Sequence, residues 1–417
     1  MALGAGHQSA QLQLTGALNR CGGGVVTRGM NNISGGRSGC LELKSPTAIA
    51  ATQPSIAAVA VKFPPNRCTQ DEAISALTDF AGPEFRRFAL KSGVDFRNTA
   101  LPLSQYSELS GFTEANDLYI EVALDLAEQA FLAALDQAKI KPSEVDIVFS
   151  TTVTGLAVPT LEARLAARVG LRQDVKRVPL FGLGCVAGAA GTARMHDYLL
   201  AFPGQVAALI AVELCSLTIQ RKDNSVANLV AASLFGDGAA VVIAKGADRA
   251  AADSRAPSRH SGRSGRNGAS GRSRGPRVLA TRSRIYPDTE EVMGWRIGSD
   301  GFKIVLSVDV ATVTDKYLGD DVRGFLADHG LTPEDVSTWV CHPGGPRVIE
   351  AVENVLDLPG NALDHTRASL RNNGNLSSVS VLDVLRANLA DPPPAGSFGL
   401  MIAMGPAFCC ELVLLAW

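Results

Sequence analysis

Apolar runs alternate with amphipathic segments along most of this 417-residue chain. The runs at residues 56–63, 145–152 and 205–213 are short and rich in valine, isoleucine and alanine, which predicts buried strands. Residues 117–138 and 161–169 instead repeat apolar positions at helical spacing. Strands that alternate with helices in this way predict an α/β fold.

The second half of the chain repeats the order of elements found in the first. The turn at residues 140–145 (I-K-P-S-E-V) follows a predicted helix and precedes a predicted strand, and residues 331–336 (L-T-P-E-D-V) do the same. Cys185 and Asn375 lie almost equally far beyond these two turns, each where a glycine-containing turn leads into a helix. The spacing therefore predicts one α/β unit used twice, with Cys185 and Asn375 meeting at a shared centre.

Two segments lack the apolar content of a packed core. Residues 1–54 are basic, serine-rich and poor in acids, which predicts a disordered extension; a transit peptide and a true start at Met30 are the alternatives. Residues 247–277 consist largely of arginine, serine, glycine and alanine, which predicts a disordered insertion. An RNA-binding tract would need interleaved aromatic residues. The two halves are then residues 55–246 and 278–417.

Composition excludes several classes of function. The formal net charge of −2 gives no electrostatic reason to expect nucleic acid as a partner. No apolar run reaches the roughly 18 residues that a membrane span needs, so we expect no stable membrane insertion. The eight cysteines show no paired spacing and the six histidines show no metal-ligand spacing. We therefore expect reduced thiols, a cytoplasmic location and no metal site.

The chemistry of the first half centres on Cys185. It follows the apolar run V-P-L-F and two glycines, and it precedes the small residues A-G-A-A-G of a predicted helix. A thiol at the N-terminus of a helix lies at the positive end of the helix dipole, which lowers the thiol pKa. The residue is thus a candidate nucleophile, and a buried structural cysteine is the alternative.

His342 and Asn375 complete a possible catalytic set with Cys185. His342 directly follows the predicted strand at residues 337–341, and Asn375 stands in the turn G-N-L-S-S. Each residue alone could be structural. Together, an imidazole beside the thiol would favour thiolate, and the imidazole and carboxamide N–H groups could stabilise an oxyanion on a bound thioester. With a malonyl thioester, that oxyanion is the enolate left after loss of carbon dioxide. Gly344 and Gly345 leave room for a pantetheine arm.

These motifs resemble a known family. The segments G-C-V-A-G-A-A-G, L-F-G-D-G-A-A, C-H-P-G-G-P-R, G-N-L-S-S and M-G-P-A-F-C-C-E-L-V-L-L are similar to those of type III polyketide synthases, the chalcone synthase-like branch of the thiolase fold. The resemblance covers residues 55–417 apart from the insertion. It implies two pseudo-symmetric halves, each with a mixed five-stranded sheet, stacked as layers αβαβα. It also implies acyl transfer from CoA thioesters, malonyl-CoA and acyl-CoA as substrates, no further cofactor, and a homodimer.

The resemblance also assigns residues to roles. Cys185 would carry the acyl group, His342 and Asn375 would support decarboxylation, and Phe235 would separate the CoA tunnel from the cavity. The loop at Val158–Pro159 matches a cis-peptide loop that reaches into the partner subunit. Glu84 stands where the family has a third basic residue, and Ala407 where it usually has glycine. The remaining implied positions are CoA-binding Arg87, Lys91, Gly344 and Gly345, and cavity-lining Thr154, Gly294, Phe302 and Ser377.

Within the family, the runs V-E-L-C-S-L-T and M-G-W resemble bacterial enzymes that extend long-chain fatty acyl-CoA to alkyl α-pyrones or alkylresorcinols. Three other readings use the same residue types. A ketoacyl synthase of fatty-acid initiation prefers an H-Q-A-N-type motif, where this chain has H-P-G-G-P. A papain-like hydrolase needs a C-G-[SA]-C-[WY] motif, which Cys185 lacks. A non-catalytic binding module would be missing a catalytic residue, and none is missing.

Overall fold

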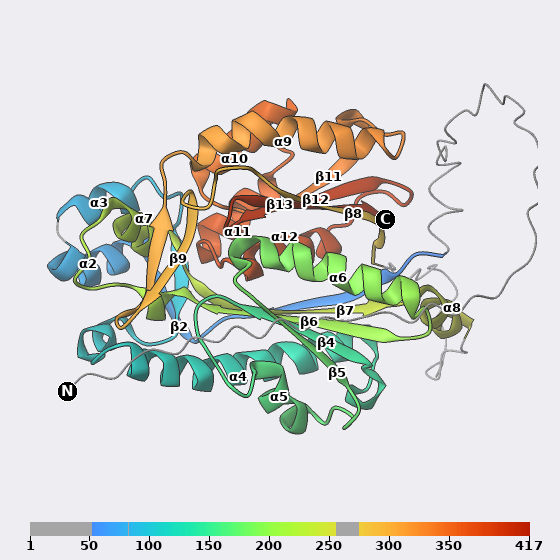
Figure 1. The fold of residues 1–417 in the computed structure, drawn as a ribbon, viewed down its shortest axis with the longest axis horizontal. Helices are drawn as coiled ribbons and strands as arrows, with labels where there is room; N and C mark the ends of the chain where they lie inside the picture. Colours follow the sequence, from blue (N-terminus) through green and yellow to red (C-terminus); the bar gives the residue numbers. More distant parts are fainter. Residues whose placement is uncertain (1–51, 82, 256–274) are drawn as a thin grey trace, which may run out of the picture. The chain divides into compact units, whose positions relative to one another are not determined.

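The computed structural model describes residues 52–81, 83–255 and 275–417 (Figure 1). Most of the predicted extension at residues 1–54 and much of the predicted insertion lie outside these residues. No helix within them is long and apolar enough to cross a membrane. The six cysteines described (Cys68, Cys185, Cys215, Cys341, Cys409 and Cys410) are free thiols.

Nine strands form one mixed sheet in the order β11-β12-β13-β8-β1-β7-β6-β4-β5. Within each half the pairings follow one scheme: two antiparallel pairs and then a parallel pair, β1–β7–β6–β4 in the first half and β8–β13–β12–β11 in the second. The predicted repeat is therefore confirmed at the level of topology. The strands are β1 (Ser55–Lys62), β4 (Ile147–Thr152), β5 (Lys176–Phe181), β6 (Val206–Leu214), β7 (Asp237–Lys245), β8 (Arg277–Ile285), β11 (Val336–Cys341), β12 (Phe398–Gly405) and β13 (Cys409–Ala416).

The repeat is also visible in its turns. Pro142–Glu144 and Pro333–Asp335 are both short 3₁₀ helices that begin with proline. In each, an acidic side chain reaches back to a backbone N–H at the start of the turn, at 2.8 Å for Glu144 to Lys141 and 2.8 Å for Asp335 to Thr332. This capping satisfies donors that the turn would otherwise leave unpaired.

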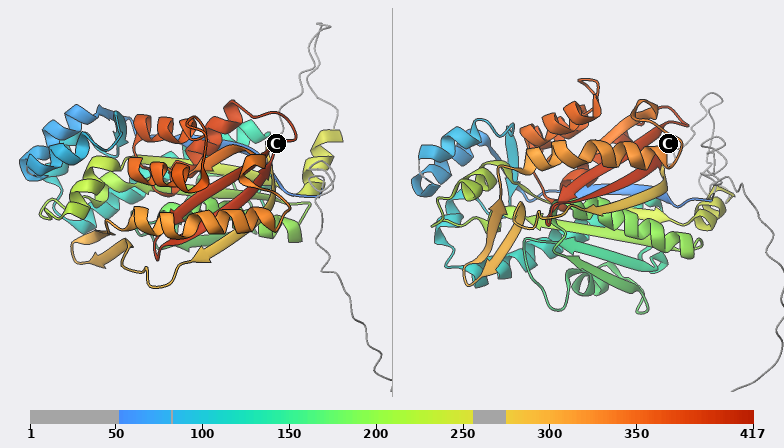
Figure 2. Two further views of the ribbon diagram at one scale, coloured as in Figure 1. Left: turned by 90° about the horizontal axis from the view of Figure 1, so that it is seen from above. Right: turned by 45° about the horizontal axis from the view of Figure 1, so that its top comes forward.

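Helices and strands stack in five layers (Figures 1 and 2). Helices α4 (Phe112–Ala138) and α5 (Leu161–Val169) cover the first-half strands from outside, and α9 (Val310–Ala327) and α10 (Pro346–Leu356) cover the second-half strands. Between the two sets of strands lie α6 (Ala187–Ala201) and α12 (Ser378–Ala390). The central pair is buried along most of its length, as its position between the two sets of strands requires.

The second half differs from the prediction of five strands. Four of its strands join the described sheet, because the segment before Asn375 forms helix α11 (Asp364–Asn373) where the first half has β5. The sequence D-H-T-R-A-S-L-R-N-N lacks the β-branched run that a strand favours. The two sets of strands are also joined by a β1–β8 pairing at Ser55 and Arg277, so they form one sheet rather than two.

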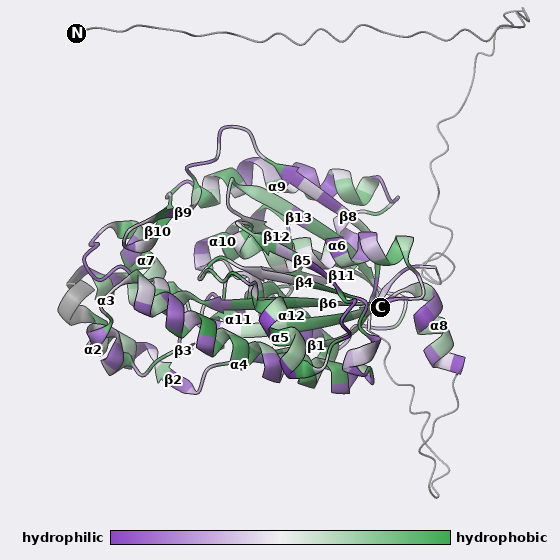
Figure 3. Ribbon diagram, turned by 60° about the horizontal axis from the view of Figure 1, so that its bottom comes forward, coloured by the Kyte–Doolittle hydropathy of each residue, from purple (hydrophilic) through white to green (hydrophobic). Residues whose placement is uncertain are grey.

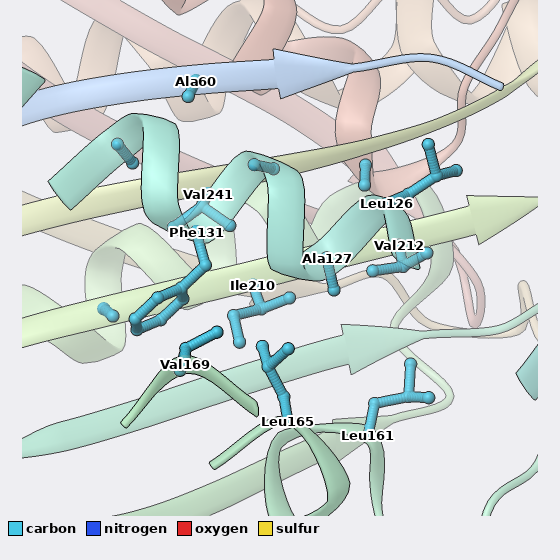
Figure 4. Close-up of a cluster of buried hydrophobic side chains, with 14 of the residues drawn as sticks. Ala60, Leu126, Ala127, Phe131, Leu161, Leu165, Val169, Ile210, Val212 and Val241 are labelled. Atoms are coloured by element: carbon cyan, nitrogen blue, oxygen red, sulfur yellow. The ribbon is translucent and has the colours of Figure 1, made fainter. Parts of the chain in front are cut away.

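Three apolar clusters fill the spaces between the layers. In the first, Phe131 and Ala127 of α4 pack on Ile210 of β6 and on Leu165 of α5 (Figure 4). Full burial of a side chain such as Phe131 contributes roughly 1.5–3 kcal/mol. The other two clusters surround α6 and α12, and join α9, α10 and α11 to the second-half strands.

The insertion begins later than predicted. Residues 247–255 form helix α8 (Ala247–Arg255), which is strongly hydrophilic in Figure 3. Two ion pairs attach it to the fold, Arg249 to Glu144 at 2.8 Å and Lys245 to Asp253 at 2.7 Å. These charges offset the low apolar content on which the prediction of disorder rested. The remainder, residues 256–274, lies outside the described chain.

Smaller elements gather at one end of the layers, on the left of Figure 1. They supply part of the walls of the cavities described below. These elements are β2 (Asn66–Thr69), α2 (Gln70–Ala81), α3 (Pro83–Ala89), β3 (Phe96–Thr99), α7 (Val226–Leu234), β9 (Met293–Gly298) and β10 (Gly301–Leu306).

Candidate active site

The turn before α6 presents Cys185. Gly184 has φ +57°, a conformation that L side chains rarely adopt, and a Cβ at this position would lie 2.8 Å from Pro406. Cys185 then occupies a single 3₁₀ turn and is buried. Gly188 allows close approach to the second half, because a Cβ there would lie 2.4 Å from the carbonyl oxygen of Ser378. The small residues predicted to permit such an approach do so.

The turn before α12 presents Asn375 in the equivalent place. Gly374 has φ +72°, and Asn375 is buried directly after it. The side-chain oxygen of Asn375 accepts a hydrogen bond from the Ser377 N–H at 2.8 Å, and its amide nitrogen lies 3.4 Å from the carbonyl oxygen of Gly344. The Ser377 hydroxyl lies 3.8 Å from the sulfur of Cys185. The two turns thus meet, as the repeat predicted.

His342 enters the same region from the end of β11. Its backbone N–H donates to the carbonyl oxygen of Ile402 at 2.9 Å, which continues the β11–β12 pairing. The imidazole is buried, and within the described residues neither ring nitrogen has a hydrogen-bond partner. Unpaired buried nitrogens are costly unless a ligand or another group uses them. Both ring nitrogens are therefore available to a substrate.

Burial controls the protonation of the thiol and the imidazole. It raises the pKa of Cys185 to about 12 and lowers the pKa of His342 to about 3, because desolvation favours the neutral form of each group. The direction for Cys185 is opposite to the lowered pKa expected from its place before a helix. If the proton of Cys185 passed to the imidazole of His342, the two opposite charges would stabilise each other and favour the thiolate.

This coupling gives a prediction for His342→Ala. Without the imidazole the buried thiol must ionise alone, so alkylation of Cys185 by iodoacetamide near pH 7 should slow by about 10²-fold. The apparent pKa of the Cys185 thiol should be higher in the variant than in wild type, because the imidazolium no longer stabilises the thiolate. The rate is measured by intact-protein mass from about pH 5 to about pH 10. His365→Ala, on α11, is the control and should leave the profile unchanged; an unchanged profile in His342→Ala would exclude the coupling.

A buried carboxyl group near the site was not among the predicted residues. Glu213 on β6 accepts hydrogen bonds from Ser378 at 2.6 Å, Thr154 at 2.9 Å and the Val153 N–H at 3.1 Å. It also accepts one from Ser377 at 3.3 Å. Burial raises the pKa of Glu213, and these hydrogen bonds act in the opposite direction. The sequence does carry a signal for this residue, because Glu213 lies inside the apolar run A-A-L-I-A-V-E-L. An acid buried in such a run needs hydrogen-bond partners within the protein.

A cavity of about 470 Å³ brings most of the predicted residues together. A second cavity, of about 600 Å³, contains the other two, Thr154 and Phe302. Phe235 lines both cavities, as expected of a residue that separates two compartments. The predicted residues in the first cavity are Arg87, Lys91, Cys185, Phe235, Gly294, His342, Gly344, Gly345, Asn375 and Ser377.

The backbone of Phe235 is paired with that of Asn375. Gly236 donates its N–H to the Asn375 carbonyl at 3.0 Å, and the Asn375 N–H donates to the Leu234 carbonyl at 2.8 Å. This parallel bridge joins the two halves of the chain directly at the site. The bridge thereby fixes the backbone of Phe235, from the first half, beside that of Asn375, from the second half.

The basic residues expected at the mouth of the first cavity are exposed. Arg87 forms an exposed ion pair with Glu84 at 3.4 Å, and Lys91 follows one turn later. An exposed pair of this kind contributes little to stability. Glu84, which replaces the third basic residue, therefore competes with an anionic ligand for Arg87. Within the described parts of the chain, no three His, Cys, Asp or Glu side chains are grouped to hold a metal ion.

The Val158–Pro159 peptide bond is cis, as predicted. Val158 is 93% exposed, and its loop is held by two hydrogen bonds between Leu156 and the side chain of Asn116, at 2.8 and 2.9 Å. The apolar side chain of Val158 is thus exposed on a loop that Asn116 holds in place. Ala407 has φ +61°, a conformation that favours the glycine usual at that position.

Comparison with known proteins agrees with this geometry. Residues 102–249 match the profile "Chalcone and stilbene synthases, N-terminal domain", and residues 277–416 match the corresponding C-terminal domain. The chain is 48% identical over 371 residues to a 1,3,6,8-tetrahydroxynaphthalene synthase of Streptomyces peucetius subsp. caesius, covering 87% of this chain and 93% of that protein. It is 25% identical to a phloroglucinol synthase of Pseudomonas fluorescens, over 86% and 97% of the two chains.

Solved structures give the same result for the fold. The crystal structure of 1,3,6,8-tetrahydroxynaphthalene synthase from Streptomyces coelicolor, described as a bacterial type III polyketide synthase, superposes with a TM-score of 0.78 and 26% identity. It covers 87% of this chain and 99% of that one. PKS-I from the brown alga Ectocarpus siliculosus superposes with a TM-score of 0.76, also at 26% identity, over 87% and 98% of the two chains. The predicted thiolase-like fold is confirmed.

Proposed function

The chain belongs to the chalcone and stilbene synthases, the type III polyketide synthases, and on that premise we propose that Cys185, His342 and Asn375 perform its condensation reaction. Members of this family are acyl-transferring enzymes that condense malonyl-CoA units. The observation that carries the assignment of residues is that a thiol, an imidazole with two free nitrogens and a carboxamide line one cavity. Membership of this family argues against the three alternative functions, which are a ketoacyl synthase, a hydrolase and a non-catalytic binding module.

In the proposed loading step, Cys185 attacks the thioester carbonyl of the starter. Its proton passes to His342, and the sulfur forms a bond to the acyl carbon while the bond to the CoA sulfur breaks. The CoA thiolate leaves and takes up the proton from the imidazolium. His342 is then neutral again, which its desolvated position favours.

In the proposed extension step, malonyl-CoA binds with its thioester oxygen between His342 and Asn375. An imidazole N–H and the carboxamide N–H donate to that oxygen, so carbon dioxide leaves as the enolate forms. The enolate carbon attacks the acyl carbon on Cys185, and the bond to the sulfur breaks. Asn375 suits this role because the Ser377 N–H occupies its oxygen, which orients the amide nitrogen as a donor.

The CoA portion is proposed to lie along the first cavity. Arg87 and Lys91 at its mouth supply positive charge for phosphates, and Gly344 and Gly345 line the wall beside His342. Phe235 then stands between this channel and the second cavity. The substrates are CoA thioesters, and the proposal requires no other cofactor.

We further propose that the starter is itself malonyl-CoA and that the product is a polyhydroxylated aromatic ring. Two observations support this. The lining of the second cavity includes polar Tyr106, Ser216 and Gln220 beside apolar Phe302, and a mixed lining of this kind suits an oxygen-rich chain better than a long alkyl chain. A relative with 48% identity is a 1,3,6,8-tetrahydroxynaphthalene synthase. The long-chain alkyl α-pyrone or alkylresorcinol expected from the sequence motifs is the competing product.

The test is incubation of the whole protein with ¹³C-labelled malonyl-CoA, alone and with acyl-CoAs of increasing chain length. We expect consumption of malonyl-CoA without any other starter, and a product in which every carbon carries label. A product that forms only with added acyl-CoA, and whose mass follows chain length, would favour the alkyl assignment. No turnover under either condition would contradict the proposed function.

The proposal includes a homodimer in the cytoplasm. The exposed Val158, on the loop fixed by Asn116, supports this because a second copy would remove it from water. Contact through this loop would bring the second copy close to the second cavity, whose lining includes Asn116.

A further inference from the structure

Arg97 on β3 is a fully buried arginine that none of the foregoing steps uses. Its guanidinium donates to three backbone carbonyl oxygens at the end of α7: Ala232 at 2.6 Å, Ser233 at 2.7 Å and Phe235 at 3.0 Å. It also donates to the side-chain oxygen of Gln70. The partners of this cation are thus backbone carbonyl oxygens at the C-terminus of α7 and the side-chain oxygen of Gln70, the first residue of α2.

This arrangement follows from the electrostatics of helix ends. The last carbonyls of a helix lack partners within the helix and carry partial negative charge, so a cation there is favourable. Burial lowers the pKa of Arg97 to about 10, and the nearby Cys68 and Asp237 oppose that shift. At neutral pH the guanidinium therefore remains protonated. Because its planar fork reaches several acceptors at once, lysine could not replace all of these bonds.

Gln70 completes the contact with the end of α7. Its side-chain nitrogen donates to the Ser233 carbonyl at 2.9 Å, to the Ala89 carbonyl at 3.0 Å and to the Ser92 hydroxyl at 2.9 Å. The end of α7 is therefore fixed both to β3 and to the segment after α3. Arg97 and Gln70 supply these hydrogen bonds, and Leu229 and Ala232 of α7 add apolar packing against α2 and α3.

The segment that Arg97 holds carries both Phe235 and the partner of Asn375. The Phe235 carbonyl accepts from Arg97, while Leu234 and Gly236 on either side pair with the backbone of Asn375. A Cβ at Gly236 would lie 2.3 Å from the carbonyl oxygen of Asn373. The segment after α7 and the segment before α12 are therefore in close backbone contact. A shift at the end of α7 would therefore move Phe235 and Asn375 together.

We propose that Arg97 is a positioning residue for chain extension, acting through Phe235 and Asn375. The inference rests on the proposed function, in which those two residues serve extension. Within the described residues, none of the hydrogen bonds of Arg97 goes to the Cys185 turn or to the loop that carries His342. Acyl loading should therefore be spared when Arg97 is changed, and decarboxylation should not.

The experiment compares Arg97→Lys and Arg97→Met with wild type in two separate assays. Loading of Cys185 by acyl-CoA is followed by rapid quench and intact-protein mass, and decarboxylation is followed as release of ¹⁴CO₂ from malonyl-CoA. We expect loading rates within about threefold of wild type. The kcat for decarboxylation should fall by about 10²-fold, more for Met than for Lys, because displacements of about 1 Å have effects of this size.

Two further variants make the result specific. Arg67→Lys, an exposed arginine on the neighbouring β2 strand that lies over the Phe96 ring, should leave both assays unchanged. Gln70→Met removes the hydrogen bond from Gln70 to the end of α7. We expect the rate of decarboxylation to fall by about tenfold while the rate of loading stays near that of wild type. This variant also tests the inference if the Arg97 variants fail to fold.

Equal losses in loading and decarboxylation, or no loss in either, would overturn the positioning role. Loss of decarboxylation in Arg67→Lys would do so as well. Failure of the proposed function has a different signature, because wild type itself would then release no carbon dioxide from malonyl-CoA.

Discussion

Cys185→Ala is expected to abolish polyketide formation, with a loss of at least about 10⁴-fold, because the proposed acyl-enzyme forms on its sulfur. The sulfur lies at the meeting point of the two turns, 3.8 Å from the hydroxyl of Ser377. Incubation with acyl-CoA should add the acyl mass to wild type and none to the variant, as read by intact-protein mass spectrometry. Product formation from malonyl-CoA should disappear in the same preparation.

Cys215 provides a matched control because its thiol lines the same cavity. Burial raises its pKa well above the usual range, and it lies just past the end of β6, in the short 3₁₀ helix Cys215–Thr218, rather than in the turn before α6. Cys215→Ala should therefore still acquire the acyl group on Cys185. An acylated Cys185→Ala protein, or a Cys215→Ala protein that no longer loads, would contradict the assignment of the nucleophile.

Local sequence patterns predicted the parts of the fold that local physics determines. The two proline turns, Pro142–Glu144 and Pro333–Asp335, are capped alike because each carries an acid at the same offset. The turns at Cys185 and Asn375 follow from glycines that must adopt positive φ immediately before them. From these turns the sequence also predicted that both residues share a site, since a repeated unit places equivalent turns at its centre.

Features that depend on long-range contacts were not predictable in the same way. The hydrogen bond between Glu213 and Ser378 forms only in the folded chain, where β6 lies beside the turn that begins α12. Helix α8 is joined by Arg249 to Glu144, about a hundred residues earlier in the chain. The raised pKa of Cys185 depends on burial by residues from both halves, which outweighs the local helix effect. Each of these is a tertiary effect with no periodic signature.

The pairing of Phe235 with Asn375 belongs to this second group and has the largest functional consequence. A stretch after α7 and a stretch before α12 exchange two backbone hydrogen bonds, so the first half of the chain fixes the carboxamide of the second. Arg97 acts on that same pairing from a third segment. In the proposed mechanism, the Asn375 turn is thus held by contacts that do not include the Cys185 turn, so we expect that decarboxylation can be disturbed without equal loss of loading.

That separation is tested most strongly by Asn375→Ala. Loss of one oxyanion donor should reduce malonyl-CoA decarboxylation by about 10²–10³-fold, because the enolate oxygen then keeps only the His342 donor in a desolvated cavity. The acyl group should still transfer to Cys185 at a rate within about threefold of wild type, since that step uses the thiol and imidazole. The two rates are measured by release of ¹⁴CO₂ and by the mass of the acyl-enzyme.

Asn372→Ala is the matched control, because Asn372 is exposed and its amide donates only to the Ala368 carbonyl of its own helix, at 2.9 Å. It should behave as wild type in both assays. If Asn375→Ala lost loading and decarboxylation to the same extent, the carboxamide would be supporting the fold of the site as a whole. A selective loss instead identifies it as a donor to the enolate oxygen that decarboxylation produces, rather than to the thioester that Cys185 attacks during loading.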